Sequence, residues 1–286
     1  MPELPEVETV CRDLSDYLCG LTLDEADIYG KRTIRRSTWT DKDIVHAIQG
    51  LQLAKVARYG KFIVFYFEDY LTRSNPYLVV HLGMSGRFMY KSAVVSSGID
   101  HSKLYLRFGD RELVLWDPRT FGEVFMEKHL EADGRPSTVS SVLGVDPILY
   151  REKVPLALKM AADRSKRPIK SVLLDQRVIA GLGNIYSDEV LFRCGLRPNR
   201  SIASLNGTEI EILAEGINEV LTEAIEMRGS SLNDLSYLDL AGLPGTYQRK
   251  HLIYGRYGKP CSRCGSIVER VLLSGRYSSY CRDCQR

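Results

Sequence analysis

Hydrophobic positions follow two different periods along the chain. In residues 6–18 the apolar side chains recur at helical spacing, which predicts one amphipathic helix. Between residues 21 and 126 they form short runs rich in β-branched and aromatic residues, which predict strands. The predicted strands are FIVFYF (62–67), YLVVHL (77–82), RFMY (87–90), KLYLRF (103–108), ELVLW (112–116) and EVFM (123–126). Several short strands at this spacing are typical of a β-sandwich or a barrel.

After residue 150 the hydrophobic pattern becomes helical. Apolar residues in the segment 208–225 share one helix face, and Thr208 with Glu211 fits a capping box at its start. Residues 229–258 are rich in loop-forming residues, and residues 128–150 have the composition of a linker or cover. The second half of the chain is therefore expected to be helical rather than β-rich.

Two shorter segments precede that helix. KRPIKSVLLD (166–175) and GLGNIYSDEV (181–190) predict a helix, a turn and a second helix, with Asn184 as the cap of the second. Exposed backbone amides at such a helix start can bind phosphate. Lys166 and Lys170 add positive charge at the start of the first helix. The pair of helices is a candidate phosphate-binding element.

The change of pattern predicts two domains and an α+β fold class. The chain has 286 residues, which is enough for two domains. We expect an N-terminal β-sandwich domain with an N-terminal helix over residues 1–130 and a linker over residues 131–150. A helical domain then covers residues 151–286, and its last part, residues 252–286, is a small cysteine module.

The overall composition is ordinary for a soluble globular protein. Hydrophobic residues make up 44% of the chain and charged residues 26%. No segment approaches the roughly 20 uninterrupted apolar residues that a membrane helix needs, and no signal peptide pattern leads the chain. The expected location is therefore the cytoplasm, with no membrane contact.

Positive charge is concentrated in two segments. The net charge is only +3, but residues 241–286 hold nine Lys or Arg against two Asp or Glu, a local charge of +7. Residues 151–170 hold seven against two, a local charge of +5. The remaining residues must therefore sum to −9. This asymmetry indicates a basic face for a polyanion, although a basic C-terminal segment alone can also be an ordinary solvated surface.

Four of the seven cysteines form a metal-binding pattern. CSRC (261–264) and CRDC (281–284) are separated by sixteen residues, a spacing typical of one tetrahedral zinc site on a β-hairpin. The ligands would be Cys261, Cys264, Cys281 and Cys284. Four thiolates leave no open coordination position, so the metal would be structural. The alternative of two disulfides fits poorly with a chain that has no secretion signal.

Three turns carry side chains suited to contact with nucleic acid. Arg276 would project from the tip of the zinc hairpin, where an Arg can grip a phosphate. HLGMSGR (81–87) places Met84 on an inter-strand loop, where an exposed Met could unstack bases. DPRTFG (117–122) offers Arg119 and Phe121 on another loop. Taken singly, each could be an ordinary surface or core residue.

The first residues suggest a nucleophile. MPELPEVETV could be no more than a rigid lead-in to a helix, with Pro5 in its first turn. However, Met1 precedes a small residue and is a plausible target for removal, which would leave Pro2 at the N-terminus. Its secondary amine could attack a sugar aldehyde and form a charged iminium that acts as an electron sink.

Together these motifs resemble one known family. PELPEVETV, GKF, HLGMSG, DPRTFG, RPIKSVLLDQ, GLGNIY and the zinc hairpin occur in the order found in bacterial formamidopyrimidine-DNA glycosylases. The resemblance covers essentially the whole chain, and the motifs are specific in combination. It implies a β-sandwich domain followed by a helix–two-turn–helix domain with a zinc-finger hairpin. It also implies a DNA glycosylase and abasic-site lyase acting in base-excision repair.

The resemblance implies four catalytic residues. Pro2 would form the Schiff base with C1′ of the damaged nucleoside, and Glu3 would be the general acid in base release. Lys61, in the motif GKF, matches the family lysine assigned to β-elimination. Arg276 matches the hairpin Arg that grips the phosphates around the lesion and assists δ-elimination.

The resemblance also implies a set of DNA contacts. Met84, Arg119 and Phe121 would fill the space left by the extruded nucleotide, with Arg119 reading the orphaned base. Asn184 would contact a backbone phosphate, and His101 resembles a further DNA-contacting His. The expected DNA-binding residues are Met84, His101, Arg119, Phe121, Lys166, Lys170 and Asn184.

Some positions depart from the family pattern. Thr120 stands where many members have a second basic residue, which would weaken a phosphate contact. Another family lysine falls on Ser165 here, with Lys166 beside it. The lesion-capping loop would lie within residues 228–248.

The expected partner is damaged double-stranded DNA containing oxidised purines such as 8-oxoguanine and formamidopyrimidines. We expect a monomer in the bacterial cytoplasm with one structural Zn²⁺ and no other cofactor. Two alternatives stay open at this point. One is a zinc-dependent nucleic-acid-binding protein without catalysis, which would have no need for a free Pro2 beside Glu3. The other is an endonuclease VIII-like enzyme for oxidised pyrimidines, which Leu4 disfavours because those enzymes typically begin Pro-Glu-Gly.

Overall fold

The computed structural model describes residues 1–68, 76–90, 101–132, 134–232 and 237–286. The chain forms two compact units. The first contains residues 1–141 and 227–246, and the second contains residues 142–226 and 247–286. Residues 227–246 follow the longest helix of the second unit in sequence but pack with the first unit. The domain boundaries predicted from the sequence placed these residues in the helical domain.

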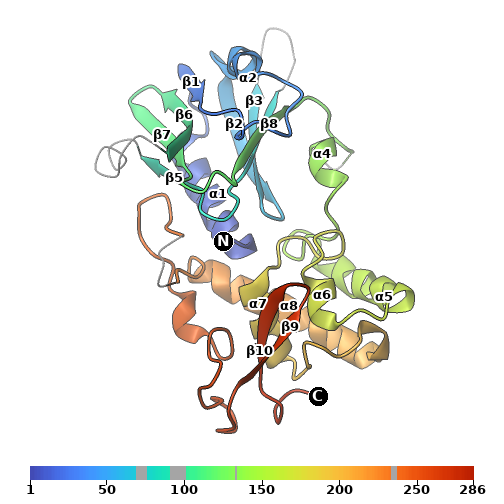
Figure 1. Ribbon diagram of the computed structural model, residues 1–286. Helices are drawn as coiled ribbons and strands as arrows, with labels where there is room; N and C mark the ends of the chain where they lie inside the picture. Colours follow the sequence, from blue (N-terminus) through green and yellow to red (C-terminus); the bar gives the residue numbers. More distant parts are fainter. Residues whose placement is uncertain (69–75, 91–100, 133, 233–236) are drawn as a thin grey trace. The chain divides into compact units, whose positions relative to one another are not determined.

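Two antiparallel sheets build the first unit (Figure 1). One has the strand order β1-β6-β7-β5 and the other β2-β3-β4-β8. The strands are β1 Glu25–Ile28, β2 Gln52–Tyr59, β3 Phe62–Glu68, β4 Tyr77–His81, β5 Arg87–Tyr90, β6 Ser102–Phe108, β7 Arg111–Trp116 and β8 Glu123–Glu127. All six predicted strands are therefore confirmed, and the predicted α+β fold with an N-terminal β-sheet domain is present.

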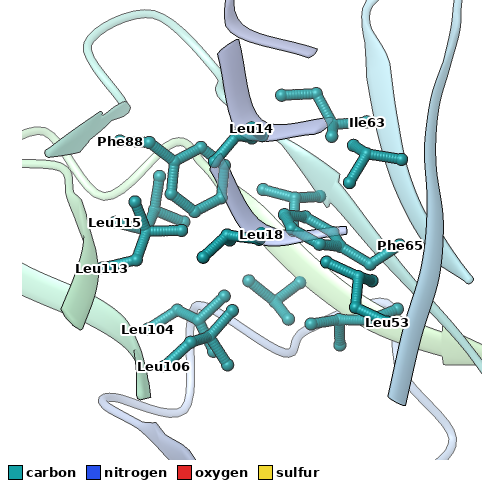
Figure 2. Packing of buried hydrophobic residues seen from close by; sticks show 14 of the residues in the cluster. Leu14, Leu18, Leu53, Ile63, Phe65, Phe88, Leu104, Leu106, Leu113 and Leu115 are labelled. Carbon is teal, nitrogen blue, oxygen red and sulfur yellow. The ribbon is translucent and has the colours of Figure 1, made fainter. Parts of the chain in front are cut away.

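Helix α1 (Leu4–Leu18) packs its apolar face into the core between the two sheets. Figure 2 shows Leu14 and Leu18 of α1 between Phe65 of β3 and the leucines of β6 and β7. Phe65 and Phe88 come from different sheets, and their rings lie 5.8 Å apart in an edge-to-face contact. This core fixes the start of α1, and with it the N-terminal residues, against the sandwich.

The sequence pattern missed three elements between residues 21 and 60. They are β1, β2 and the helix α2 (Asp41–Ile48). Strand β1 has only four residues, and a register shift between Leu53 and Lys55 interrupts the alternation of β2. Helix α2 begins with a capping box between Thr40 and Asp43, a local signal that the β-rich context concealed. The short helix α4 (Ser137–Ser140) lies in the segment expected to be a linker.

The second unit is helical and ends in a hairpin. Its elements are η2 Arg151–Lys153, α5 Val154–Arg164, α6 Ile169–Leu173, α7 Asn184–Arg193, η3 Ile202–Ser204, α8 Gly207–Glu226, η4 Tyr247–Lys250, β9 Glu269–Leu273 and β10 Arg276–Tyr280. Helices α6 and α7 are the predicted helix–turn–helix pair, and β9 and β10 form the predicted antiparallel hairpin. Within the described residues, every helix is too short or too polar to cross a membrane.

Two predicted helix caps were wrong. The capping box of α8 joins Asn206 and Glu209, not Thr208 and Glu211, because the helix already begins at Gly207. The Glu209 amide donates to Asn206 Oδ1 at 2.9 Å, and the Asn206 amide donates to Glu209 Oε2 at 3.0 Å. In α7 the cap is Gly183, and Asn184 is the first helical residue. This one-residue shift frees the Asn184 side chain for another contact.

Candidate active site and nucleic-acid interface

The N-terminal residues are held in place by the start of α1. Pro2 is buried, and Glu3 occupies the N-cap position with only 2% of its surface exposed. The backbone N–H of Glu3 donates to Glu6 Oε2 at 2.8 Å. Because Pro5 stands in the first turn, where its missing N–H is tolerated, the chain enters the helix with little freedom. Pro2 and Glu3, the predicted nucleophile and general acid, are thus adjacent, and the start of α1 holds their backbone in one conformation.

Glu6 connects this N-terminus to a distant segment of the same unit. Its Oε1 accepts the backbone N–H of Ser230 at 2.7 Å, while its Oε2 accepts Glu3 N–H. Gly229, which has a φ of 76°, passes so close that a Cβ there would lie 2.6 Å from Glu6 Oε1. Ser230 lies in the segment 228–248 that is expected to contain the lesion-capping loop, of which residues 233–236 lie outside the described residues. Glu6 was not among the predicted site residues, although its i, i+3 spacing from Glu3 is a usable signal.

Lys61 lies in the tight turn between β2 and β3. The turn is formed by Gly60 with a φ of 57°, and Lys61 has only 7% of its surface exposed. Buried Arg58 supports the turn, because its Nη1 donates to the Gly60 carbonyl at 3.0 Å and its Nε donates to Glu8 of α1 at 2.7 Å. Burial alone would raise the pKa of Glu8, but Arg58 and Arg12 hold that pKa below its ordinary value.

A half-buried imidazole lies close to Lys61. Burial, reinforced by the charges of Lys61 and two nearby arginines, lowers the pKa of His81 to about 4. His81 Nδ1 accepts the backbone N–H of Gly83 at 3.1 Å, which requires that nitrogen to be unprotonated. His81 is therefore neutral at pH 7 and fixes the start of the loop that carries Met84.

The loops that carry Met84 and Phe121 pack directly against each other. Gly83 has a φ of 63°, and a Cβ there would lie 2.5 Å from the backbone of Phe121, so only glycine fits. Buried Asp117 joins the two loops, because it accepts Ser85 Oγ–H at 2.6 Å and the Gly122 N–H at 2.7 Å. Asp117 is a supporting residue that the sequence analysis did not identify.

The predicted wedge residues are exposed on this double loop. Met84 is 38% exposed and Phe121 is 43% exposed, high values for large apolar side chains. The guanidinium of Arg119 lies 5.3 Å from the Phe121 ring centroid. The structure therefore brings Met84, Arg119 and Phe121 together, as predicted for residues that enter a DNA duplex.

His101 is also exposed and adjoins the same loop. Its carbonyl accepts the Asp117 N–H at 2.9 Å, and its ring lies 5.7 Å from the Trp116 ring. His101 thus extends the exposed polar surface of the first unit next to the loop of Arg119.

In the second unit, Asn184 and Lys170 occupy different environments. Asn184 Nδ2 donates to the carbonyl of Tyr277 in β10 at 3.2 Å, which ties the start of α7 to the hairpin. Lys170 is fully buried, and its Nζ donates to the Asn184 carbonyl at 2.9 Å and to Asp188 Oδ1 at 2.5 Å. This burial argues against the predicted DNA contact of Lys170 and gives it a role in positioning Asn184.

Asp188 and Glu189 fasten the C-terminal segments onto α7. Asp188 pairs with Lys170 and also accepts Ser278 Oγ–H and the Ser279 N–H of β10. Glu189 accepts three consecutive backbone N–H groups, at 2.8 to 3.0 Å, from residues 252–254. The sequence placed both acids in a helix but gave no sign of these partners, and apart from Lys170 they lie more than sixty residues away.

Lys166 and Arg276 are exposed, as predicted. Arg276 begins β10 directly after the turn formed by Ser274 and Gly275, whose φ angles are 49° and 74°. Ser274 Oγ lies 2.8 Å from Ser171 Oγ of α6, a contact that holds the hairpin tip on the helical body.

The four predicted cysteines converge on one point. Their Sγ atoms all lie within 4.8 Å of one another, with Cys261 and Cys284 separated by 3.9 Å and Cys264 and Cys281 by 3.5 Å. Zinc–sulfur bonds of about 2.3 Å in a tetrahedron place sulfur atoms about 3.8 Å apart, so the cysteines fit Zn²⁺. A disulfide would need about 2.0 Å, which excludes the alternative of two disulfides.

Family models match three parts of the chain. The model described as formamidopyrimidine-DNA glycosylase N-terminal domain matches residues 1–124. The model described as formamidopyrimidine-DNA glycosylase H2TH domain matches residues 143–236. The model described as zinc finger found in FPG and IleRS matches residues 258–286 and includes all four cysteines.

Individual proteins match over the full length. The chain is 39% identical to the formamidopyrimidine-DNA glycosylase of an Exiguobacterium species, and the match covers 100% of both chains. It is similar in structure to the MutM (Fpg) protein of Thermus thermophilus, with a TM-score of 0.84, 38% identity and coverage of 99% and 98%. A Lactococcus lactis Fpg bound to abasic-site DNA has a TM-score of 0.81, 29% identity and coverage of 99% of both chains.

Proposed function

Because the chain belongs to the formamidopyrimidine-DNA glycosylase family, we propose that it excises oxidised purines from duplex DNA and then cleaves the strand at the abasic site. The observation that carries this proposal is Pro2 next to buried Glu3, both fixed at the start of α1. A protein that only bound DNA would have no need for a proline nitrogen in this position.

The first step is displacement of the damaged base. Once Met1 is removed, the lone pair of the Pro2 nitrogen attacks C1′ of the sugar. The bond from C1′ to the base breaks, and the base leaves with that electron pair and with a proton from the Glu3 carboxyl. The sugar ring then opens as the bond from C1′ to the ring oxygen breaks, and the ring oxygen takes up the proton that the Pro2 nitrogen loses. This leaves an iminium between Pro2 and C1′. Because Pro2 and Glu3 are adjacent, they are oriented together for the attack on C1′ and for the proton transfer to the base.

Strand cleavage follows from the iminium. The positive charge on nitrogen acidifies the hydrogen on C2′, so loss of that proton expels the 3′ phosphate by β-elimination. We assign Lys61 to this step, because its turn is braced by Arg58 and Glu8 on the same unit. Arg276 assists the second, δ-elimination by neutralising the 5′ phosphate as it leaves.

Access to C1′ requires that the damaged nucleotide leave the duplex. Extrusion costs a few kcal/mol of stacking and pairing energy. Met84 and Phe121 offset this cost by filling the vacated space, since their exposed side chains stand on a rigid double loop. Arg119, which lies over Phe121, offers guanidinium N–H groups to the orphaned base.

Backbone phosphates are bound by groups on both units. We propose His101 on the first unit, and Asn184, Lys166 and Arg276 on the second. Zinc bound by the four cysteines would hold the hairpin in its fold. It would have no open coordination position for a reactant. A monomer in the bacterial cytoplasm fits this arrangement, because one chain supplies every proposed site residue.

The direct test is a cleavage assay with matched duplexes. One carries 8-oxoguanine, one a formamidopyrimidine, one an oxidised pyrimidine, and one is undamaged. We expect excision and strand cleavage of the first two, weak cleavage of the third and none of the last. Binding without cleavage would instead favour a DNA-binding protein, and preference for the oxidised pyrimidine would favour endonuclease VIII-like specificity.

A further inference from the structure

The outer face of the zinc hairpin carries a stack that the proposed mechanism does not use. The guanidinium carbon of Arg270 lies 4.2 Å from the ring centroid of Tyr257 and 4.3 Å from that of Tyr277. The Arg270 guanidinium thus lies against two aromatic rings. Tyr257 is 55% exposed and Tyr277 is 54% exposed, so the Tyr257–Arg270–Tyr277 stack lies at the surface.

Strand register explains why this stack faces outward. Tyr277 is paired with Leu272, and Arg270 is paired with Ser279, so Arg270 and Tyr277 are diagonal neighbours on one face of the hairpin. The intervening residue Ser278 points to the other face, where it is buried against Asp188 of α7. The helical body therefore covers one face of the hairpin, and the stack occupies the opposite one.

The charge of Arg270 is not compensated by the protein. Among the residues that the structure describes, no carboxylate forms an ion pair with Arg270. Its neighbour Arg282 differs, because its guanidinium lies 3.7 Å from Glu269 and 3.7 Å from Asp283. When aromatic rings lie against the flat surface of a guanidinium, its N–H groups stay available at the edge. That edge is the part that binds phosphate in a bidentate way.

We propose that the Tyr257–Arg270–Tyr277 stack binds a phosphate of the DNA backbone, as a contact separate from that of Arg276. The proposal rests on the function proposed above. The local charge of +7 in residues 241–286 favours a polyanion as the occupant of this face. Arg276 is paired with Leu273, three residues from Arg270, so the two arginines lie about 10 Å apart along the strand. They also point to opposite faces, so they reach different phosphates.

This contact has a distinct functional signature. Arg276 is assigned to the phosphates around the lesion, whereas Arg270 would strengthen binding of damaged and undamaged duplex equally. The two tyrosines hold the guanidinium in one orientation, which lowers the entropy lost on binding phosphate. The stack would therefore contribute to affinity and to its salt dependence, but not to selection of the lesion.

The test is the salt dependence of binding to a fluorescein-labelled duplex, with and without a reduced abasic site. Arg270→Gln should reduce the slope of log affinity against log salt concentration by about 0.9, the value for one phosphate contact. Tyr277→Ala should lower affinity for both duplexes without changing net charge, and Tyr277→Phe should keep wild-type affinity because it keeps the ring. Zinc content confirms that each hairpin is folded.

Arg282→Gln is the matched control, because it removes the same formal charge from the same module at a position already paired with carboxylates. We expect a much smaller change in slope. A wild-type slope for Arg270→Gln, or equal changes for Arg270→Gln and Arg282→Gln, would overturn the proposal. If the wild-type protein cleaves 8-oxoguanine duplex while Arg270→Gln keeps its slope, this inference fails and the proposed function stands. If the wild-type protein neither binds nor cleaves that duplex, the proposed function itself fails.

Discussion

At the scale of single residues, buried carboxylates organise the N-terminal site. Glu6 accepts one N–H from Glu3 and another from Ser230, more than two hundred residues later. Glu8 holds Arg58, which in turn supports the turn of Lys61. Each of these acids lies on α1, so one helix places the proposed nucleophile, the acid and the lysine turn in the same unit. Their partners could not be predicted, since hydrogen bonds between distant segments leave no local pattern.

Glu3→Gln should separate the two halves of the reaction. Without the proton donor, excision of 8-oxoguanine should fall by roughly 10²–10⁴, the usual range for general acid–base catalysis. Cleavage of a preformed abasic site should largely survive, because that substrate already offers an aldehyde to Pro2. Single-turnover gel assays on the two duplexes measure both rates.

Glu25→Gln is a suitable control, because Glu25 is an exposed acid of β1 paired only on the surface with Arg107. It should leave both rates unchanged. If Glu3→Gln excises 8-oxoguanine at the wild-type rate, Glu3 is not the acid.

At the scale of elements, the sequence predicted the type of most helices and strands, and the structure shows where that reasoning ends. The six strands with apolar runs rich in β-branched and aromatic residues, helices α1 and α8, and the zinc hairpin were all found. Helix caps were misplaced at Asn184 and Thr208, because several neighbouring residues could each serve as a cap. Lys170 looked like a DNA contact because its charge is visible in the sequence, whereas its partner Asp188 is revealed only by folding.

The Lys170–Asp188 pair should stabilise the second unit. Both side chains are 1% exposed, and the pair connects α6, α7 and β10. Lys170→Met would leave the Asp188 carboxylate buried without its cation. We expect a loss of about 3–5 kcal/mol in the free energy of unfolding, measured by urea denaturation.

Arg177→Gln provides the comparison, since Arg177 pairs with Asp175 but its side chain is 77% exposed. That change should cost far less, because solvent screens the exposed pair. Equal losses in the two variants would contradict the structural role of Lys170.

Zinc should be needed for DNA binding but not for folding of the first unit. Cys264→Ser removes one of four thiolates and should release the metal, because structural sites depend on all their ligands. The hairpin would then lose the geometry that holds Arg276. We expect DNA affinity to be lost, as measured by fluorescence anisotropy, while the β-sandwich keeps its circular dichroism. Full affinity in the zinc-free variant would refute this prediction.

At the scale of the whole molecule, charge and family membership could be predicted from the sequence, and the comparisons confirm the resemblance to formamidopyrimidine-DNA glycosylases. The basic segments at residues 151–170 and 241–286 lie largely in the second unit. Several of their charges take part in internal ion pairs, such as Lys250 with Glu223. The number of cations available to DNA is therefore smaller than the sequence alone indicates.

Binding of duplex DNA should be strongly salt-dependent. Each phosphate contact releases counterions and adds about −0.9 to the slope of log affinity against log salt. If several of the exposed cations contact phosphates, the affinity should fall by orders of magnitude when the salt concentration rises from low to moderate. The fall should be similar for damaged and undamaged duplex. Fluorescence anisotropy over a salt series measures this slope, and a flat titration would contradict a basic DNA-binding face.

The central claim is that Pro2 forms a covalent intermediate with the damaged nucleoside. Borohydride reduction during reaction with 8-oxoguanine duplex tests it most directly, because it converts the iminium into a stable adduct that peptide mapping can locate. We predict one adduct, on the N-terminal peptide beginning at Pro2, and none in protein that keeps Met1. Lys61→Met should still give this adduct. An adduct on Lys61, or trapping by protein that retains Met1, would contradict the account.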